Sequence, residues 1–122
     1  MNKVIGILGG TFDPPHWGHI RLAEHFSGTL QLDELFWLPS GEPWQKGAHI
    51  TPAKDRLDMT IAAADVLKEE LQAKNIDTKV MVDSMEIDRG GPSYTIDSAK
   101  ELRQKFGPDV SLIWLMGADS FL

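Results

Sequence analysis

The sequence lacks cysteine, long apolar runs and an excess of basic side chains. Without cysteine, the chain forms no disulfide, thiolate nucleophile or thiolate metal site. No run of about 18 apolar residues occurs, and no basic and apolar leader precedes Lys3, so we expect neither a membrane span nor a signal peptide and favour a cytoplasmic protein. The formal net charge of −6 argues against a general nucleic-acid surface, because such surfaces are basic.

The remaining composition is that of a soluble globular protein. The chain has 122 residues, of which 42% are hydrophobic and 25% are charged. This length suffices for one modest core, so we expect a single domain over residues 1–122. A polyanionic substrate would need local cationic or hydrogen-bonding groups on such an acidic chain.

The rest of the chain is organised around residues 6–19, which read GILGGTFDPPHWGH. The apolar, β-branched residues 3–8 predict a strand that is buried on both faces. Residues 16–27 predict a helix, with Gly28 as its stop. A strand, a glycine-rich turn and a helix in this order direct the free N–H groups of the helix start beyond the strand end. This arrangement suits a phosphate group.

Two histidines stand at the start of the predicted helix. His16 and His19 are three residues apart and so share a helix face, and Gly18 leaves the space between them open. An imidazole donates hydrogen bonds and carries positive charge near neutral pH, which suits charge developing on a phosphoryl group. The segment matches neither the P-loop pattern nor the dinucleotide-binding fingerprint, so it predicts a phosphate site of another kind.

The rest of the chain predicts an α/β fold with parallel strands. Further strands are expected at residues 35–38, 79–83 and 110–116, and further helices at residues 53–75 and 96–106. Because a helix separates the first two strands, they should be parallel. The spacing of apolar residues predicts three buried helix stripes: Ile20, Ala23, Phe26 and Leu30; Leu57, Ile61, Ala64, Leu67 and Leu71; and Ile96, Ala99, Leu102 and Phe106. Arg56 is either a surface arginine or a functional residue at the ligand-binding rim.

At this point the sequence resembles a known family. The string Gly9-Gly10-Thr11-Phe12-Asp13-Pro14-Pro15-His16-Trp17-Gly18-His19 resembles the Gly-Gly-Thr-Phe-Asp-Pro-x-His-x-Gly-His signature of bacterial nicotinate-nucleotide adenylyltransferases, which are nucleotidyltransferases with a His-x-Gly-His element. The resemblance implies a three-layer, Rossmann-like nucleotidyltransferase fold with a parallel sheet. It also implies that His16 and His19 contact the triphosphate of ATP, and that the ATP site includes Gly9, Gly10, Thr11 and Phe12.

The resemblance continues in the polar loop at residues 39–51. Here Pro43-Trp44-Gln45-Lys46 keeps only the outer residues of the family's Pro-Pro-His-Lys. Lys46 is therefore the candidate for a catalytic phosphate contact and for binding of the mononucleotide. Trp44 either stacks on the substrate ring or packs within the loop.

Two more segments resemble the family in the expected order. Residues 86–95, which we expect to form a loop at the rim, resemble Glu-x-x-Arg-x-x-Pro-Ser-Tyr-Thr and imply that Tyr94 and Thr95 lie near the pyridine carboxylate. Capping of the next helix by Thr95 would explain its hydroxyl equally well. Gly117, Asp119 and Ser120 resemble the segment beside the adenosine, where the Asp119 carboxylate would accept hydrogen bonds from the ribose.

The activity implied by the resemblance is adenylyl transfer from ATP to nicotinate mononucleotide, with Mg²⁺ bound mainly by the phosphates and no dedicated metal site. Other acceptors remain open, among them nicotinamide mononucleotide, phosphopantetheine and cytidylyl-transfer substrates. A module that binds nucleotide without turnover and a zinc site at His16, His19 and His49 are further alternatives. The oligomeric state is open, a homo-oligomer included.

The resemblance covers only the amino-terminal part of the family. A later Ser/Thr-rich motif ending in arginine, which grips the triphosphate in the family, is absent from this sequence. Either the chain is a fragment or the molecule lacks part of the active site. We also expect residues 112–115 to form an apolar sheet edge that is able to pair with another chain.

Overall fold

The computed structural model describes residues 3–41, 50–90 and 95–115, and within them the chain alternates between strands and helices. The elements in chain order are β1 (Val4–Gly10), α1 (Trp17–Thr29), β2 (Glu34–Pro39), α2 (Ala53–Ala73), β3 (Lys79–Val82), α3 (Met85–Arg89), α4 (Thr95–Phe106) and β4 (Ser111–Leu115). None of the helices in these ranges is long and apolar enough to cross a membrane.

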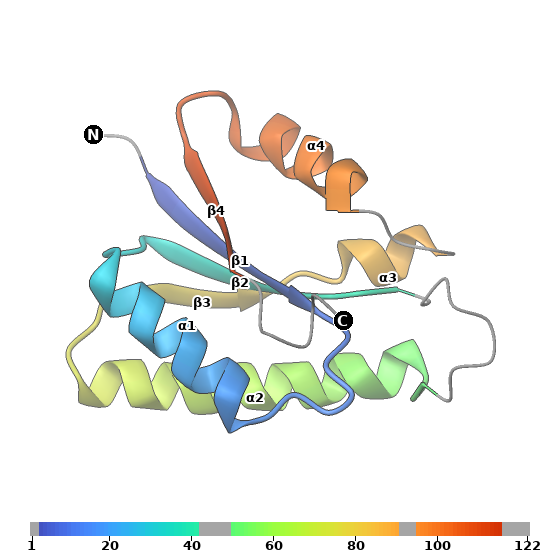
Figure 1. Ribbon diagram of the computed structural model, residues 1–122, viewed down its shortest axis with the longest axis horizontal. Coiled ribbons are helices and arrows are strands. Elements are labelled where there is room, and N and C mark those ends of the chain that lie inside the picture. The colour runs from blue at the N-terminus through green and yellow to red at the C-terminus, as the bar shows by residue number, and fades with distance from the viewer. Residues whose placement is uncertain (1–2, 42–49, 91–94, 116–122) are drawn as a thin grey trace.

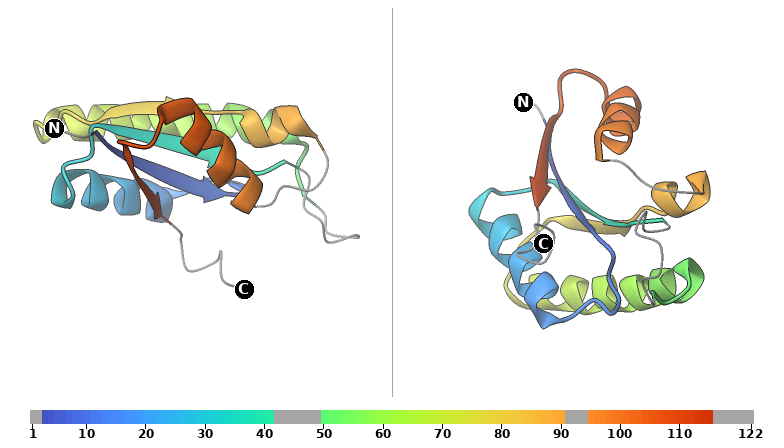
Figure 2. Two further views of the ribbon diagram at one scale, coloured as in Figure 1. Left: turned by 90° about the horizontal axis from the view of Figure 1, so that it is seen from above. Right: turned by 45° about the vertical axis from the view of Figure 1, so that its right-hand side comes forward.

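The strands form one parallel sheet in the order β3-β2-β1-β4. Ile7 of β1 pairs with Phe36 of β2 on one side and with Trp114 of β4 on the other. Helices α1 and α2 cover one face of the sheet and α3 and α4 cover the other (Figures 1 and 2). The predicted three-layer α/β fold is confirmed.

The core consists of two apolar clusters, one on each face of the sheet. Leu8 and Trp37 pack toward the face of α1 and α2, with Ala23 and Leu67 from those helices. Ile5, Ile7, Phe36 and Leu38 belong to the opposite cluster, together with Leu102 of α4. Residues of β1 therefore contribute to both clusters, as expected for a strand buried on both faces.

The buried face of α2 differs from the predicted stripe at its amino-terminal end. Ile61 is 43% exposed and Leu57 is half-buried, whereas Arg56 and Thr60 are buried. From Ala64 onward the prediction is correct, because Ala64, Leu67 and Leu71 are buried. The error arises because two polar side chains occupy the inward face of the first turns and find hydrogen-bond acceptors there.

Several smaller expectations are also wrong. Strand β1 continues through Gly9 and Gly10, and α1 continues through Gly28 to Thr29. Residues 86–95 are not a continuous loop, because α3 occupies their first part; five residues are too few to show helical periodicity. Leu30 and Ile96 are exposed rather than buried, and the buried positions of α4 include Ser98.

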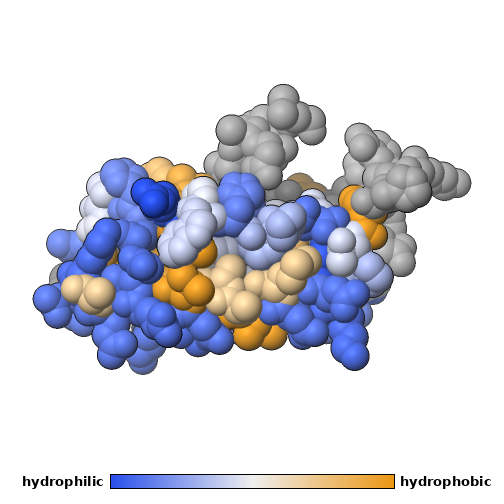
Figure 3. Space-filling model, turned by 90° about the horizontal axis from the view of Figure 1, so that it is seen from below, coloured by the Kyte–Doolittle hydropathy of each residue, from blue (hydrophilic) through white to orange (hydrophobic). Residues whose placement is uncertain are grey.

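Apolar side chains gather on the outer face of the layer that contains α1 and α2 (Figure 3). A hollow of about 330 Å³ lies there between the two helices. Its lining includes Pro14, Trp17 and Ile20 from the start of α1 and Met59 and Val66 from α2.

Candidate active site

The strand order changes direction at β1, so the carboxyl end of β1 is a switch point of the sheet. From β1 the sheet continues through β2 to β3 on one side, and β4 joins on the other side. Ligands of open α/β sheets bind beyond the carboxyl ends of the strands where the order changes direction, which here is between β1 and β4. Leu8 of β1 pairs with Leu115, the last residue of β4, so the turn that follows β1 leaves the sheet at this point.

Phe12 shapes the turn that follows β1. Its φ of +53° lies in the left-handed region, which is rare for a bulky residue and costs on the order of 1 kcal/mol or more. The ring is buried and packs against Trp37 and against the edge of His19, with centroid distances of 5.3 and 5.0 Å. This packing holds the strained backbone and orients the chain toward α1.

The predicted histidine pair is brought together at the start of α1. His16 is the N-cap residue, and its Nδ1 accepts a hydrogen bond from the Gly18 backbone N–H at 3.0 Å. His19 reaches back, and its Nδ1 accepts a hydrogen bond from the His16 backbone N–H at 3.0 Å. The centroids of the two rings are 3.9 Å apart, and the ring planes are tilted by 34° to each other. The histidines therefore form a reciprocal capping box with imidazoles in place of the usual hydroxyl and carboxylate.

This arrangement changes how the helix start can meet an anion. The N–H groups of His16 and Gly18 already donate to imidazoles, so these two are not open to a ligand, contrary to the sequence-based expectation. Because each Nδ1 accepts a hydrogen bond, the proton of each ring stands on Nε2. The backbone N–H polarises each ring, so Nε2–H should be a strengthened donor to a phosphate oxygen.

The surroundings of Gly9, Gly10 and Gly18 differ, so glycine occupies these positions for different steric reasons. A Cβ on Gly18 would lie 2.8 Å from Cε1 of the His16 ring, so only glycine leaves the cap undisturbed. A Cβ on Gly10 would lie 3.0 Å from the Phe12 ring. At Gly9 the nearest atom among the described residues would be on Trp114 at 3.9 Å, an ordinary contact distance. Among the residues that the structure describes, nothing crowds this position, which is consistent with close approach of a ligand.

Arg56 is the main site residue that the sequence reasoning left undecided, and the surface alternative is wrong. The side chain is only 1% exposed. Its Nε donates to the Thr51 carbonyl, Nη1 donates to the carbonyls of Thr11 and Ser40, and Nη2 donates to that of Gly41, all at 2.8–2.9 Å. Burial lowers the pKa of Arg56, and the charge of Asp13 raises it. One sequence signal was available, since Arg56 lies on the same helix face as the buried Thr60 and Leu67.

Asp13 links the same turn to the start of α2. Its Oδ2 accepts a hydrogen bond from the Thr51 backbone N–H at 2.9 Å. Side-chain and backbone hydrogen bonds from Thr51 lower the pKa of Asp13, and the charge of Arg56 lowers it further. Two charged side chains, Asp13 from the turn and Arg56 from α2, therefore tie the turn after β1 to Thr51, which precedes α2.

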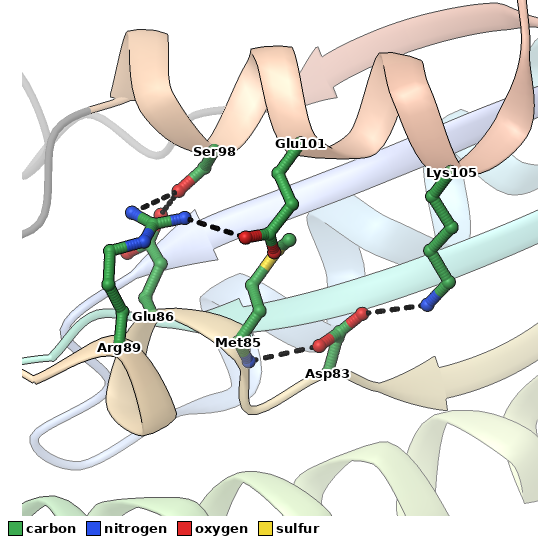
Figure 4. Close-up of polar contacts among 7 residues, drawn as sticks. All are labelled: Asp83, Met85, Glu86, Arg89, Ser98, Glu101 and Lys105. Atoms are coloured by element: carbon green, nitrogen blue, oxygen red, sulfur yellow. Dashed lines mark hydrogen bonds and ion pairs between the residues drawn. The ribbon is translucent and has the colours of Figure 1, made fainter.

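A second polar cluster joins α3 to α4 on the opposite face of the sheet (Figure 4). The buried Glu86 carboxylate accepts a hydrogen bond from the Ser98 hydroxyl at 2.6 Å. Arg89 donates to the same hydroxyl at 3.3 Å and pairs with Glu101 at 3.6 Å. Glu86 and Arg89 match the glutamate and the arginine of the family motif Glu-x-x-Arg-x-x-Pro-Ser-Tyr-Thr. Their contacts fix α4, which begins at Thr95.

Charge pairing also joins the end of β3 to α4. One Asp83 oxygen accepts from the Met85 backbone N–H at 2.9 Å, and the other pairs with Lys105 at 3.3 Å (Figure 4). These contacts hold α4 across the carboxyl half of the sheet.

The other predicted site residues lie largely outside the described part of the chain. Trp44, Lys46, Tyr94, Gly117, Asp119 and Ser120 fall there, as does His49. Thr95 is the first residue of α4. Within residues 3–41, 50–90 and 95–115, no group of three or more histidine, aspartate or glutamate side chains is placed to hold a metal ion.

The Glu86 cluster makes the stability depend on pH. Burial raises the pKa of Glu86 above its ordinary value of 4.5, against the smaller effects of the Ser98 hydrogen bond and the Arg89 charge. The folded protein thus holds this proton more tightly than the unfolded chain, so the contribution of Glu86 to stability is lost as pH rises through the folded-state pKa. We expect the stability of Glu86→Gln, which keeps an acceptor for Ser98, to rise relative to that of the unchanged protein as pH increases from about 4.5 through the raised folded-state pKa.

Urea unfolding at a series of pH values measures this difference. Glu101→Gln is the matched control, because Glu101 also pairs with Arg89 but is half exposed, where solvent screens its charge. A stability difference for Glu86→Gln that is constant or falls with pH would contradict the prediction.

The fold and site together define an α/β domain with a histidine-capped helix at the switch point of its parallel sheet. The chain belongs to the cytidylyltransferase-like family, whose model matches residues 7–122.

Among curated relatives, the chain is 40% identical over 119 residues to a protein of Herminiimonas arsenicoxydans, with 98% of this chain and 50% of the relative covered. It is 40% identical over 114 residues to a protein of Salinispora arenicola, with 93% and 55% covered. It is 38% identical over 121 residues to a protein of Dechloromonas aromatica, with 99% and 51% covered. All three are described as probable nicotinate-nucleotide adenylyltransferases. The chain spans about half the length of these relatives, and the resemblance seen in the sequence is confirmed.

Proposed function

We propose that this chain carries the ATP-binding part of a nicotinate-nucleotide adenylyltransferase. In the proposed reaction, a 5′-phosphate oxygen of nicotinate mononucleotide attacks the α-phosphorus of ATP. The bond between that phosphorus and the oxygen bridging to the β-phosphate breaks, and pyrophosphate leaves with the electron pair. The products are deamido-NAD and pyrophosphate. The observation that carries the proposal is the pair of adjacent imidazoles after the carboxyl end of β1, each of which accepts a backbone hydrogen bond on Nδ1.

The chemistry needs positioning and charge stabilisation rather than a side-chain nucleophile. The attacking phosphate is already ionised, so no general base is required. The rate then depends on alignment of attacker and leaving group and on donors to the oxygens that gain charge. In the proposal, Nε2 of His16 and of His19 donate to phosphate oxygens of ATP. Gly9 leaves room for the nucleotide beside the main chain.

Thr95 at the start of α4 and residues outside the described ranges complete the proposal. Lys46 would contact phosphate, and Trp44, Tyr94 and Thr95 would border the mononucleotide. Gly117, Asp119 and Ser120 would border the adenosine. These roles rest on the family resemblance and on relatives that are about 40% identical and bear this enzyme's name.

A magnesium ion fits the proposal as an ion carried by the phosphates. No cluster of carboxylates in the described residues is placed to hold it. The Asp13 carboxylate accepts a hydrogen bond from Thr51 rather than facing other acidic groups. When bound, Mg²⁺ would neutralise part of the phosphate charge. Soluble nucleotides are the proposed partners, in the cytoplasm.

The direct test is pyrophosphate release with ATP and Mg²⁺, comparing nicotinate mononucleotide with nicotinamide mononucleotide. It should be run on this chain and on any longer natural version. We expect turnover with the acid form. Turnover with the amide alone would replace the acceptor, and ATP binding without turnover in either version would reduce the function to nucleotide binding.

A further inference from the structure

Arg56 is a buried cation whose hydrogen bonds within the described residues are made to main-chain carbonyls. Its guanidinium donates to four carbonyls and lies almost wholly out of solvent. The side chain starts from the first turn of α2 and reaches the carboxyl ends of β1 and β2. A buried arginine has a desolvation cost, so such a residue persists where it meets several acceptors at once.

The four carbonyls come from three separate parts of the chain. Thr11 follows β1 and begins the turn that leads to the histidines. Ser40 and Gly41 follow β2, and Thr51 precedes α2. One rigid, planar group therefore ties the ends of β1 and β2 to the start of α2.

A further contact ties the same turn to Thr51. The Asp13 carboxylate accepts the Thr51 N–H, while the Thr51 carbonyl accepts from Arg56. Thr51 is thus joined to the turn directly through Asp13 and indirectly through Arg56, which also donates to the Thr11 carbonyl. Ser40 is also held by its own N–H, which donates to the Gly10 carbonyl at 2.8 Å.

From these contacts we infer that Arg56 is a positioning residue for ATP: it fixes the turn at residues 11–16, and through that turn the His16 and His19 donors. The inference rests on the proposed function. Arg56 itself does not bind substrate, because its guanidinium faces carbonyls and has almost no exposed surface. Lysine cannot replace it, since a single ammonium group does not span the four acceptors.

The test compares Arg56→Lys with Thr60→Val in the catalytically active form of the protein. The Thr60 hydroxyl is buried and donates to the Arg56 carbonyl, so Thr60→Val weakens the same turn of α2 without touching the carboxyl ends of β1 and β2. At a temperature where both variants are folded, we expect Arg56→Lys to lower kcat/KM for ATP by roughly tenfold to a hundredfold. Thr60→Val should leave it unchanged.

Amide hydrogen exchange provides a readout that does not need activity. In Arg56→Lys, the amides of Ser40 and Thr51 should exchange faster, because their segments lose a shared anchor. The amides of Asp33 and Ser111, which lie near the amino ends of the strands, should keep their exchange rates. Asp13→Ala, which keeps Arg56 but frees the Thr51 N–H, should give the same local pattern and serves if Arg56→Lys does not fold.

The outcomes separate this inference from the proposed function. If the unchanged protein releases no pyrophosphate, the proposed function fails. If Arg56→Lys still shows faster exchange confined to the segments of Ser40 and Thr51, the anchoring role of Arg56 stands. Uniform or absent acceleration overturns the anchor. If Arg56→Lys keeps full kcat/KM for ATP in an active enzyme, or if Thr60→Val lowers it equally, the positioning role is wrong. Full retention of ATP binding by Arg56→Lys with loss in Arg56→Gln would indicate a direct phosphate contact instead.

Discussion

His16→Asn should abolish most of the activity without destabilising the fold. Asparagine is among the best N-cap residues, and its side-chain oxygen can accept from Gly18 N–H as Nδ1 does. It has no donor where Nε2 stands. We expect the free energy of unfolding to stay within about 1 kcal/mol of the unchanged protein. Pyrophosphate release should fall about 10²- to 10³-fold, the usual cost of removing one preorganised donor.

The loss should appear mainly in kcat rather than in KM for ATP, because the donor meets charge that develops in the transition state. His25→Asn is the matched control, since His25 is an exposed histidine of the same helix. We expect it to leave both kinetic constants unchanged. Wild-type kcat in His16→Asn would remove His16 from the proposed reaction.

His19→Gln applies the same test to the second ring. Glutamine at this position of a capping box accepts the N–H of the N-cap residue, so the bond to His16 can persist. This change also removes the ring that packs on Phe12, and some loss of stability is expected with it. His16 therefore separates capping from catalysis more cleanly.

The fold could be predicted well from the sequence because the residues that form β1 and the turn after it are contiguous. A short apolar run that fills both faces, followed by glycines and a helix start, has few alternatives in a parallel sheet. The spacing of His16 and His19 likewise predicted that they share a face, and their rings lie together. The positions of the later strands followed from the same patterns.

What the sequence could not show depends on tertiary partners. Arg56 reads as a charged residue on a helix, and its burial depends on carbonyls that the turn after β1 and the end of β2 bring to it. The acceptor role of each Nδ1 depends on the capping geometry, which composition and spacing do not encode. Ile61 and Ile96 are exposed because polar residues occupy the inward face of their helices instead.

Gly18→Ala should lower activity while leaving stability nearly unchanged. The new Cβ would lie 2.8 Å from Cε1 and 2.9 Å from Nδ1 of His16, so the ring has to move. Loss of the cap costs about 1 kcal/mol, and replacing a helical glycine with alanine returns up to about 1 kcal/mol, so the two effects offset. The displaced ring no longer holds Nε2 in place, and we expect pyrophosphate release to fall about 10²-fold.

Gly28→Ala provides the comparison at the other end of α1. Its Cβ would lie 3.3 Å from Cδ1 of Ile76, a contact that a small shift relieves, and it is far along the helix from the histidines. Both variants add one methyl group to a glycine in the same helix, so a loss of activity confined to Gly18→Ala can only reflect the position of His16. The ¹⁵N signals of the histidine rings should report that movement directly, because Nδ1 loses its hydrogen bond from Gly18. Changed ring signals together with unchanged turnover would mean that the capped geometry is not what catalysis requires. Unchanged ring signals would contradict the expected displacement of His16.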